Sequence, residues 1–106
     1  MTVEELTVFK PLCLPKAKRE INGVYIGDLL SWVMGRAQEN NAWITIMSNL
    51  NVIAVASLAD VSCVILAEGV ALEPDVLKTA QEKGINILCS DKPIYETALM
   101  LEQALK

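Results

Sequence analysis

The spacing of apolar residues along the chain predicts alternating strands and helices. Four short apolar runs, each bounded by turn-forming residues, are typical of buried strands: Val24–Ile26, Trp43–Met47, Val61–Leu66 and Ile85–Leu88. The segments between these runs carry helix signals. Strands that alternate with helices form parallel sheets covered by those helices. The sequence therefore predicts an α/β fold, a mostly parallel sheet of four to five strands with helices on both faces.

Start and stop signals place three of the helices. Pro74–Lys83 has an acidic residue in its first turn and Gly84 just past its end. Pro93 opens a final helix that runs to Leu105, for which Ser90 or Asp91 is the expected cap. A third helix is expected from Asp28, as its cap, to about Gln38. Its core-facing stripe would consist of Leu29, Leu30, Val33, Met34 and Ala37.

The segment Asn51–Asp60 is apolar nearly all round and allows two interpretations. As a helix capped by Asn51, it has Ser57 as its only polar side chain between the ends. As a strand, it would be long and buried on both faces. The alternation of strands and helices favours the helix. A helix without a polar face needs cover on both sides, so we expect a homodimer with Val52, Val55 and Leu58 at the interface.

Trp32 lies off the apolar stripe of its expected helix. A tryptophan in that position marks an interface with another chain or lies over the edge of its own domain. Both interpretations stay open on the sequence alone.

The first twenty residues form a short segment of the single domain expected over residues 1–106. Thr2 and Glu5 have the spacing of a capping box. Pro11 and Pro15 interrupt any longer helix, so we expect one or two helical turns followed by an irregular or edge segment through Leu14.

The charge of the chain argues against nucleic-acid binding. The net charge is −4, and only 5% of the residues are aromatic, whereas phosphate backbones attract basic surfaces. The charge is uneven: residues 1–19 carry four basic and two acidic residues, a net +2, and the remainder carries −6. The basic segment is either a patch that meets an acidic partner or a solvated loop.

Composition narrows the chemistry further. The chain has no histidine, which excludes imidazole bases and histidine-containing zinc sites. Its three cysteines include no Cys-x-x-Cys pair, which indicates reduced thiols and a cytoplasmic location. Neither a signal peptide nor a membrane span is expected, and no glycine-rich loop has the spacing for phosphate binding. We therefore expect no catalytic residues, no metal and no cofactor.

Polar residues follow each of the predicted strands. In a parallel sheet, ligands bind beyond the carboxyl ends of the strands, where helix N-termini present free amides. A small polar or anionic ligand could bind there, with Lys92 as its counter-charge. The candidate residues are Asp28, Ser48, Asn49, Asn51, Glu68, Ser90 and Lys92. The other interpretation of these residues is ordinary turn and cap chemistry.

The segments Gly23–Ala37, Ala42–Ile46, Asn51–Leu58 and Val64–Leu66 resemble the DRTGG domain family, especially its short stand-alone bacterial members. The resemblance covers roughly residues 20–105. The segment Cys63–Ser90 is also similar to the N-terminal domain of HPr kinase/phosphorylase. These likenesses imply the α/β fold shared by that domain and the N-terminal domain of MurF.

The resemblance implies a regulatory or dimer-forming module that accompanies phosphotransacetylase-like domains and CBS-domain pyrophosphatases, and it supplies no catalytic residues. Ala67-Glu68-Gly69 stands where relatives often have Thr-Gly-Gly, and Ser48-Asn49-Leu50 stands where they have a histidine. The favoured function is a non-catalytic regulatory domain that self-associates, with a regulatory protein as a further partner. The alternative is a dedicated binder of a small nucleotide or anionic metabolite, and the third hypothesis is an enzyme acting on phosphoryl groups.

Overall fold

The computed structural model describes residues 1–106. The strands are β1 (Lys10–Cys13), β2 (Val24–Ile26), β3 (Ala42–Thr45), β4 (Cys63–Leu66) and β5 (Ile87–Cys89). The helices are the single 3₁₀ turn η1 (Val3–Glu5), followed by α1 (Leu30–Arg36), α2 (Leu50–Ala59), α3 (Pro74–Lys83) and α4 (Ile94–Leu105). None of these helices is long and apolar enough to cross a membrane.

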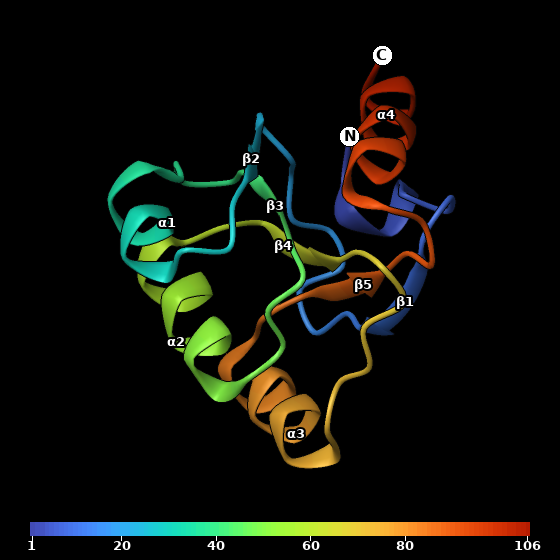
Figure 1. Cartoon of the computed structure of the whole chain (residues 1–106). Helices are drawn as coiled ribbons and strands as arrows, with labels where there is room; N and C mark the ends of the chain where they lie inside the picture. Colours follow the sequence, from blue (N-terminus) through green and yellow to red (C-terminus); the bar gives the residue numbers. More distant parts are fainter.

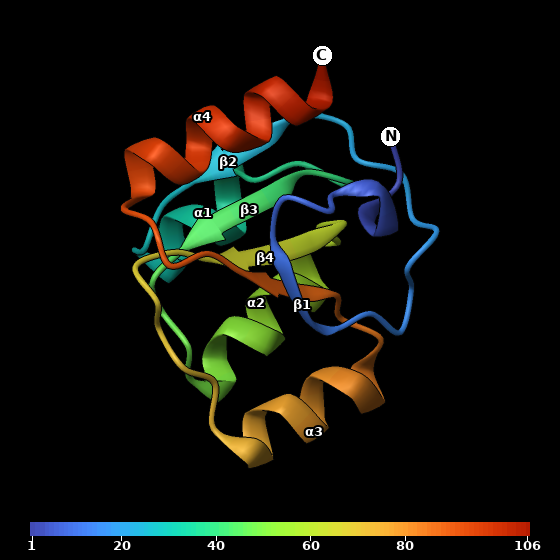
Figure 2. The same ribbon diagram turned by 90° about the vertical axis from the view of Figure 1, so that its right-hand side faces the viewer.

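The five strands form one sheet in the order β1-β5-β4-β3-β2. Strands β2 to β5 are parallel, and β1 pairs antiparallel with β5 at one edge. Helices α1, α2 and α3 lie along one face of the sheet, and α4 lies on the other with η1 (Figures 1 and 2). The predicted α/β architecture is confirmed.

Two apolar layers hold the helices to the sheet. Successive side chains of a strand point to opposite faces, so Trp43 and Val64 belong to the cluster shared with α2 and α3, whereas Ile44 and Ile65 belong to the cluster shared with α4. All four of these side chains are fully buried. Since both faces are covered, the central strands need continuous apolar sequence, which is the pattern that predicted them.

Helices α2 and α3 end in the same way. Asp60 and Gly84 follow the last helical residues in the left-handed conformation, with φ of 58° and 73°. The amide of Val61 donates to the carbonyl of Ala56 at 3.2 Å, and that of Ile85 to Ala80 at 2.9 Å. These are the six-to-one bonds of a Schellman motif, so the last carbonyls of both helices are satisfied within the chain. The predicted helix from Pro74 to Lys83 is confirmed.

The prediction that Asp28 caps α1 is wrong. Leu29 occupies the N-cap position, and no side chain caps the helix. The carboxylate of Asp28 instead accepts hydrogen bonds from the Thr45 hydroxyl at 2.7 Å and from the Ile46 amide at 3.0 Å. Asp28 therefore joins the end of β2 to the end of β3.

The predicted apolar stripe of α1 is also partly wrong. Only Val33 is buried, while Leu29 and Met34 are 58% and 47% exposed. Leu30 and Ala37 pack against the edge of the core. The helix has only seven residues and lies beside α2 near the end of the sheet, so only one narrow flank of it meets the core.

Two further caps differ from the sequence prediction. Asn49 occupies the N-cap position of α2, so Asn51 lies inside the helix and is exposed. Pro93 occupies the N-cap position of α4, and neither Ser90 nor Asp91 caps that helix. The hydroxyl of Ser90 is bonded elsewhere, as described below.

The segment that was ambiguous in sequence is helix α2, which confirms the preferred interpretation. Within the single chain only one side of this helix is buried, and cover of its other side by a second copy stays a prediction. Val52 and Val55 are only 2% and 6% exposed in the domain's own core, so their assignment to a dimer interface is wrong. The outward strip of the helix consists of Leu50, Asn51, Ala54, Ser57 and Leu58, all exposed, with Leu58 at 71%.

The N-terminal segment follows the sequence prediction. Glu5 accepts hydrogen bonds from the amide and the hydroxyl of Thr2 at 2.7 and 2.9 Å, which forms the capping box of η1. These bonds favour the carboxylate and lower the pKa of Glu5. The predicted edge segment is β1, whose register shifts between Pro11 and Cys13.

Candidate functional site

The carboxyl ends of β2 to β5 lie together at one end of the sheet, as the parallel pairing requires. The polar residues predicted to bind a ligand there form three separate groups. Asp28 is the first, with its carboxylate bonded to the end of β3. It is positioned further by Trp43, whose indole N–H donates to the carbonyl of Gly27 at 2.9 Å and fixes the turn after β2.

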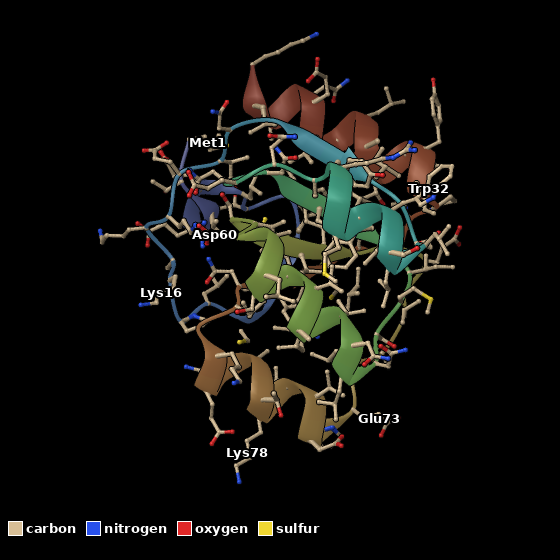
Figure 3. The ribbon with its side chains drawn as sticks, turned by 90° about the vertical axis from the view of Figure 1, so that its left-hand side faces the viewer. Met1, Lys16, Trp32, Asp60, Glu73 and Lys78 are labelled. Carbon is tan, nitrogen blue, oxygen red and sulfur yellow. The ribbon has the colours of Figure 1, made fainter.

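The second group lines a groove between the N-terminal ends of α2 and α3. Ser48, Asn49 and Asn51 face Glu73 and Asp75 across a hollow of about 460 Å³. Figure 3 shows Glu73 at this end of the molecule, the end that also carries Trp32. Two carboxylates at the rim disfavour an anion, and Lys92 does not line this groove.

The third group joins the end of β4 to the end of β5. The amide of Glu68 donates to the carbonyl of Lys92 at 2.8 Å, and that of Gly69 donates to Ser90 at 2.9 Å. The Ser90 hydroxyl bonds to Thr97 at 2.9 Å and accepts from the amide of Lys92 at 3.1 Å. These polar groups are used within the turn. Ligand binding by the seven strand-end residues stays a prediction.

A larger cavity lies at the opposite end of the sheet. It measures about 660 Å³ and is formed by the 14–19 loop and the C-terminal ends of α2 and α3. Its charged side chains are Glu4, Lys16, Lys18, Arg19, Asp60 and Lys83. Figure 3 shows Asp60 and Lys16 together on this side of the molecule. The basic segment seen in the sequence is therefore one wall of a cavity.

The wall of this cavity is fixed by Asn86, the residue that precedes β5. Its side-chain oxygen accepts from the amide of Lys16 at 2.9 Å, and its nitrogen donates to the carbonyl of Lys16 at 2.8 Å and of Ser62 at 2.9 Å. The sequence analysis missed this residue. A polar side chain inside the apolar run Ile85–Leu88 needs buried partners, and that was the signal available.

Arg19 ties the same loop to the end of α2. Its Nε donates to Asn40 Oδ1 at 3.0 Å, and its Nη2 donates to the carbonyl and carboxylate oxygens of Asp60 at 2.6 and 2.7 Å. The Arg19 guanidinium lowers the pKa of Asp60 by this hydrogen bond and by its charge. A cation at a helix C-terminus is also favoured by the helix dipole.

Comparison with known families accounts for most of the chain. The model of the DRTGG domain matches residues 14–104. The chain belongs to the DRTGG domain family. None of the curated proteins matches it.

A solved structure shares the fold of this DRTGG domain. It is the crystal structure of the CBS and DRTGG domains of the regulatory region of Clostridium perfringens pyrophosphatase, complexed with its activator, diadenosine tetraphosphate. The similarity has a TM-score of 0.72 at 12% sequence identity and covers 96% of this chain. The chain spans 44% of the length of that structure. The resemblance to the HPr kinase N-terminal domain stays a prediction.

The two edges of the DRTGG sheet differ in how they meet solvent. Edge β1 carries Lys10 and Pro11 and has an irregular register. Edge β2 has the sequence Val-Tyr-Ile and carries neither charge nor proline. Apolar side chains beside this edge are exposed: Val24 38%, Ile26 47%, Leu29 58%, Trp32 53% and Met34 47%. Trp32 is exposed on α1, with the Arg36 guanidinium 3.9 Å from the centre of its ring.

The cysteines of the DRTGG domain are all free thiols. Burial raises the pKa of Cys63 to about 12 and also raises the pKa of Cys13. A thiol is nucleophilic as its thiolate, so these two side chains act as small apolar residues of the core. No group of three or more potential metal ligands is present.

The Arg19–Asp60 pair gives a testable pH dependence. Asp60 lies in the left-handed region, which asparagine also tolerates, so Asp60→Asn removes mainly the charge. The side chain is 51% exposed, and screening limits the loss of unfolding free energy at pH 7 to less than about 1 kcal/mol.

The folded-state pKa of Asp60 is lowered, so its contribution is present above the unfolded-state pKa and is lost as pH falls through the folded-state value. Urea unfolding at pH 7 and below about pH 4 should therefore show the difference from wild type shrinking in acid. A difference that grows in acid would contradict this assignment.

Proposed function

We propose that this DRTGG domain is a non-catalytic regulatory module that acts by pairing with a second copy of itself. Its family membership supports a regulatory role, because a domain of the same fold lies in the regulatory region of the clostridial pyrophosphatase. Three free cysteines support a reducing, cytoplasmic location. The homodimer would present two copies together to a regulatory partner protein.

The unprotected edge of β2 carries this proposal. The carbonyl of Gly23 and the amide of Gly27 bond to β3 at 3.0 and 3.2 Å. Backbone groups of alternate residues point to opposite sides of a strand, so those of Val24 and Ile26 point away from the sheet. Natural sheets protect such edges with charges, proline or bulges, as β1 does. Edge β2 is instead apolar and open to another strand.

A second copy supplies a matching strand. If two β2 strands pair antiparallel about Tyr25, Val24 of each copy lies opposite Ile26 of the other. This is the self-complementary contact of a twofold dimer. The sheet would then continue from one copy into the other, and the exposed α1 side chains Leu29, Trp32 and Met34 would flank the joint. Burying them removes apolar surface from water.

The test is the mass in solution at micromolar concentration. We expect wild type at about twice the 11.6 kDa chain mass by light scattering, and Ile26→Lys at the monomer mass, because a charge in the joint cannot be desolvated. Leu58→Lys is the matched control, since Leu58 is the most exposed apolar residue of α2.

The outcomes separate the two surfaces. If Leu58→Lys is dimeric and Ile26→Lys is monomeric, the β2 edge is the interface. A monomeric wild type would refute self-association. A dimer that only Leu58→Lys disrupts would move the interface to α2 and refute the pairing of β2.

A further inference from the structure

We propose that the cavity at the C-terminal ends of α2 and α3 binds a small organic phosphate with a double negative charge. This goes beyond self-association and places a ligand at the end of the sheet opposite to the strand-end loops. The cavity measures about 660 Å³, within the range of small-molecule sites.

The charges around the cavity leave two cations without an acidic partner. Lys18 pairs with Glu4 at 3.4 Å, and Arg19 pairs with Asp60 at 2.7 Å. Lys16 and Lys83 form no ion pair, so the cavity has an excess of two positive charges on a chain of net charge −4. A ligand dianion supplies the missing charge.

The C-termini of α2 and α3 face the cavity with partial negative charge, and the cations beside them must offset it. The Schellman motifs satisfy the carbonyls of Ala56 and Ser57 in α2 and those of Ala80 and Gln81 in α3. At α2 the carbonyl of Asp60 also accepts from Arg19, so a cation lies beside it. Arg19 uses Nε and Nη2 for these contacts, which leaves Nη1 free to donate to a ligand oxygen.

The remaining lining suits the organic part of such a ligand. The half-buried residues Leu14, Pro15 and Ala17 provide apolar surface beside the cations. The stem of Lys16 lies over Gly84, where a Cβ would approach Lys16 Cε to 3.1 Å. Since Asn86 fixes the backbone of Lys16 through both its amide and its carbonyl, the start of this side chain is positioned beside the cavity before a ligand arrives.

The test is a titration of the ¹⁵N-labelled full chain, with Ile26→Lys in place so that the result does not depend on dimer formation. The probes are AMP and glucose 6-phosphate, with adenosine and inorganic phosphate as controls. We expect both phosphate esters to shift the amides of Ala17, Ser57 and Gly84, with a dissociation constant of about 1 mM or tighter. Adenosine should not shift them, and inorganic phosphate should bind more weakly.

Charge variants test the assignment of the cations. Lys16→Gln and Lys83→Gln should each weaken binding about tenfold, because each removes a charged hydrogen-bond donor. Both side chains are exposed, so the fold should tolerate these changes. Lys78→Gln is the matched control on the same helix as Lys83: its side chain points into solvent in Figure 3, and it does not line the cavity, so binding should be unchanged.

Three results would overturn the proposal. One is the absence of shifts with both phosphate esters. The second is equal weakening by Lys78→Gln, which would indicate only general charge attraction. The third is a set of shifts confined to the strand-end groups around Ser48 and Ser90. Because the titration uses the edge variant, its failure would leave the proposed dimer untouched.

Discussion

Replacing Trp43 by alanine is expected to lower the free energy of unfolding by about 4 kcal/mol, a large share of the roughly 5–15 kcal/mol by which domains are stable. Trp43 is fully buried in the middle of β3, where it packs in the cluster beneath the helices. The change removes the largest core side chain and leaves a cavity. It also leaves the carbonyl of Gly27 without its indole donor.

Two further variants separate these causes. Trp43→Phe keeps most of the apolar contact but loses the hydrogen bond, so it should cost about 1–3 kcal/mol. Trp32→Ala removes the other tryptophan, which is 53% exposed, and should change the stability of the monomer by less than about 1 kcal/mol. Urea denaturation followed by far-UV circular dichroism measures all three. A loss below about 2 kcal/mol for Trp43→Ala would contradict the assigned burial.

The parts of the fold that the sequence predicted well depend on signals within the residues of each element. Pro74, Asp75 and Gly84 mark the ends of α3 within the segment itself, and the structure begins and ends the helix there. The strands were predictable because a strand covered on both faces needs a continuous apolar run. The buried strands Ala42–Thr45 and Cys63–Leu66 show this pattern.

The cap predictions for Asp28 and Ser90 failed because each side chain has another hydrogen-bond partner. Asp28 has the right residue type to cap α1, yet its carboxylate bonds to Thr45, seventeen positions later. The hydroxyl of Ser90 likewise bonds to Thr97. The preference of a residue type for cap positions describes only the hydrogen bonds that its side chain can form with nearby backbone groups. It does not include the partners that the tertiary fold brings close to that side chain.

The side of α2 that meets the core could not be predicted for a different reason. Its apolar residues surround the helix, so no stripe points to the sheet. In the structure, neighbouring helices cover the flanks of α2. Figure 1 shows α1 and α3 on either side of it, so only a narrow strip of α2 is exposed to solvent. The expected second copy was inferred from too much apolar surface, most of which these two helices cover.

The candidate site shows the same limit. The charge excess of residues 1–19 was visible in the sequence, but its meaning depends on Asp60, which lies forty-one positions beyond Arg19. Lys83 reaches the same cavity from the end of α3. Local sequence identifies a basic segment, and only the tertiary fold assigns it to the wall of a cavity.

The residue that links these elements gives the second large effect. Asn86 is 1% exposed and makes three hydrogen bonds, two to the backbone of Lys16 and one to the carbonyl of Ser62. Asn86→Ala leaves these backbone groups without their side-chain partner. We expect a loss of about 3 kcal/mol in unfolding free energy, measured by urea denaturation.

The same variant should affect the proposed ligand site more than stability alone explains. Without Asn86 the backbone of Lys16 is no longer fixed, so AMP affinity should fall even under conditions where the variant is fully folded. Gln81→Ala is the control, since Gln81 is exposed on α3 and does not line the cavity, and both stability and affinity should stay near wild type. A loss below about 1 kcal/mol for Asn86→Ala would mean that water replaces its bonds, and that the loop does not depend on this side chain.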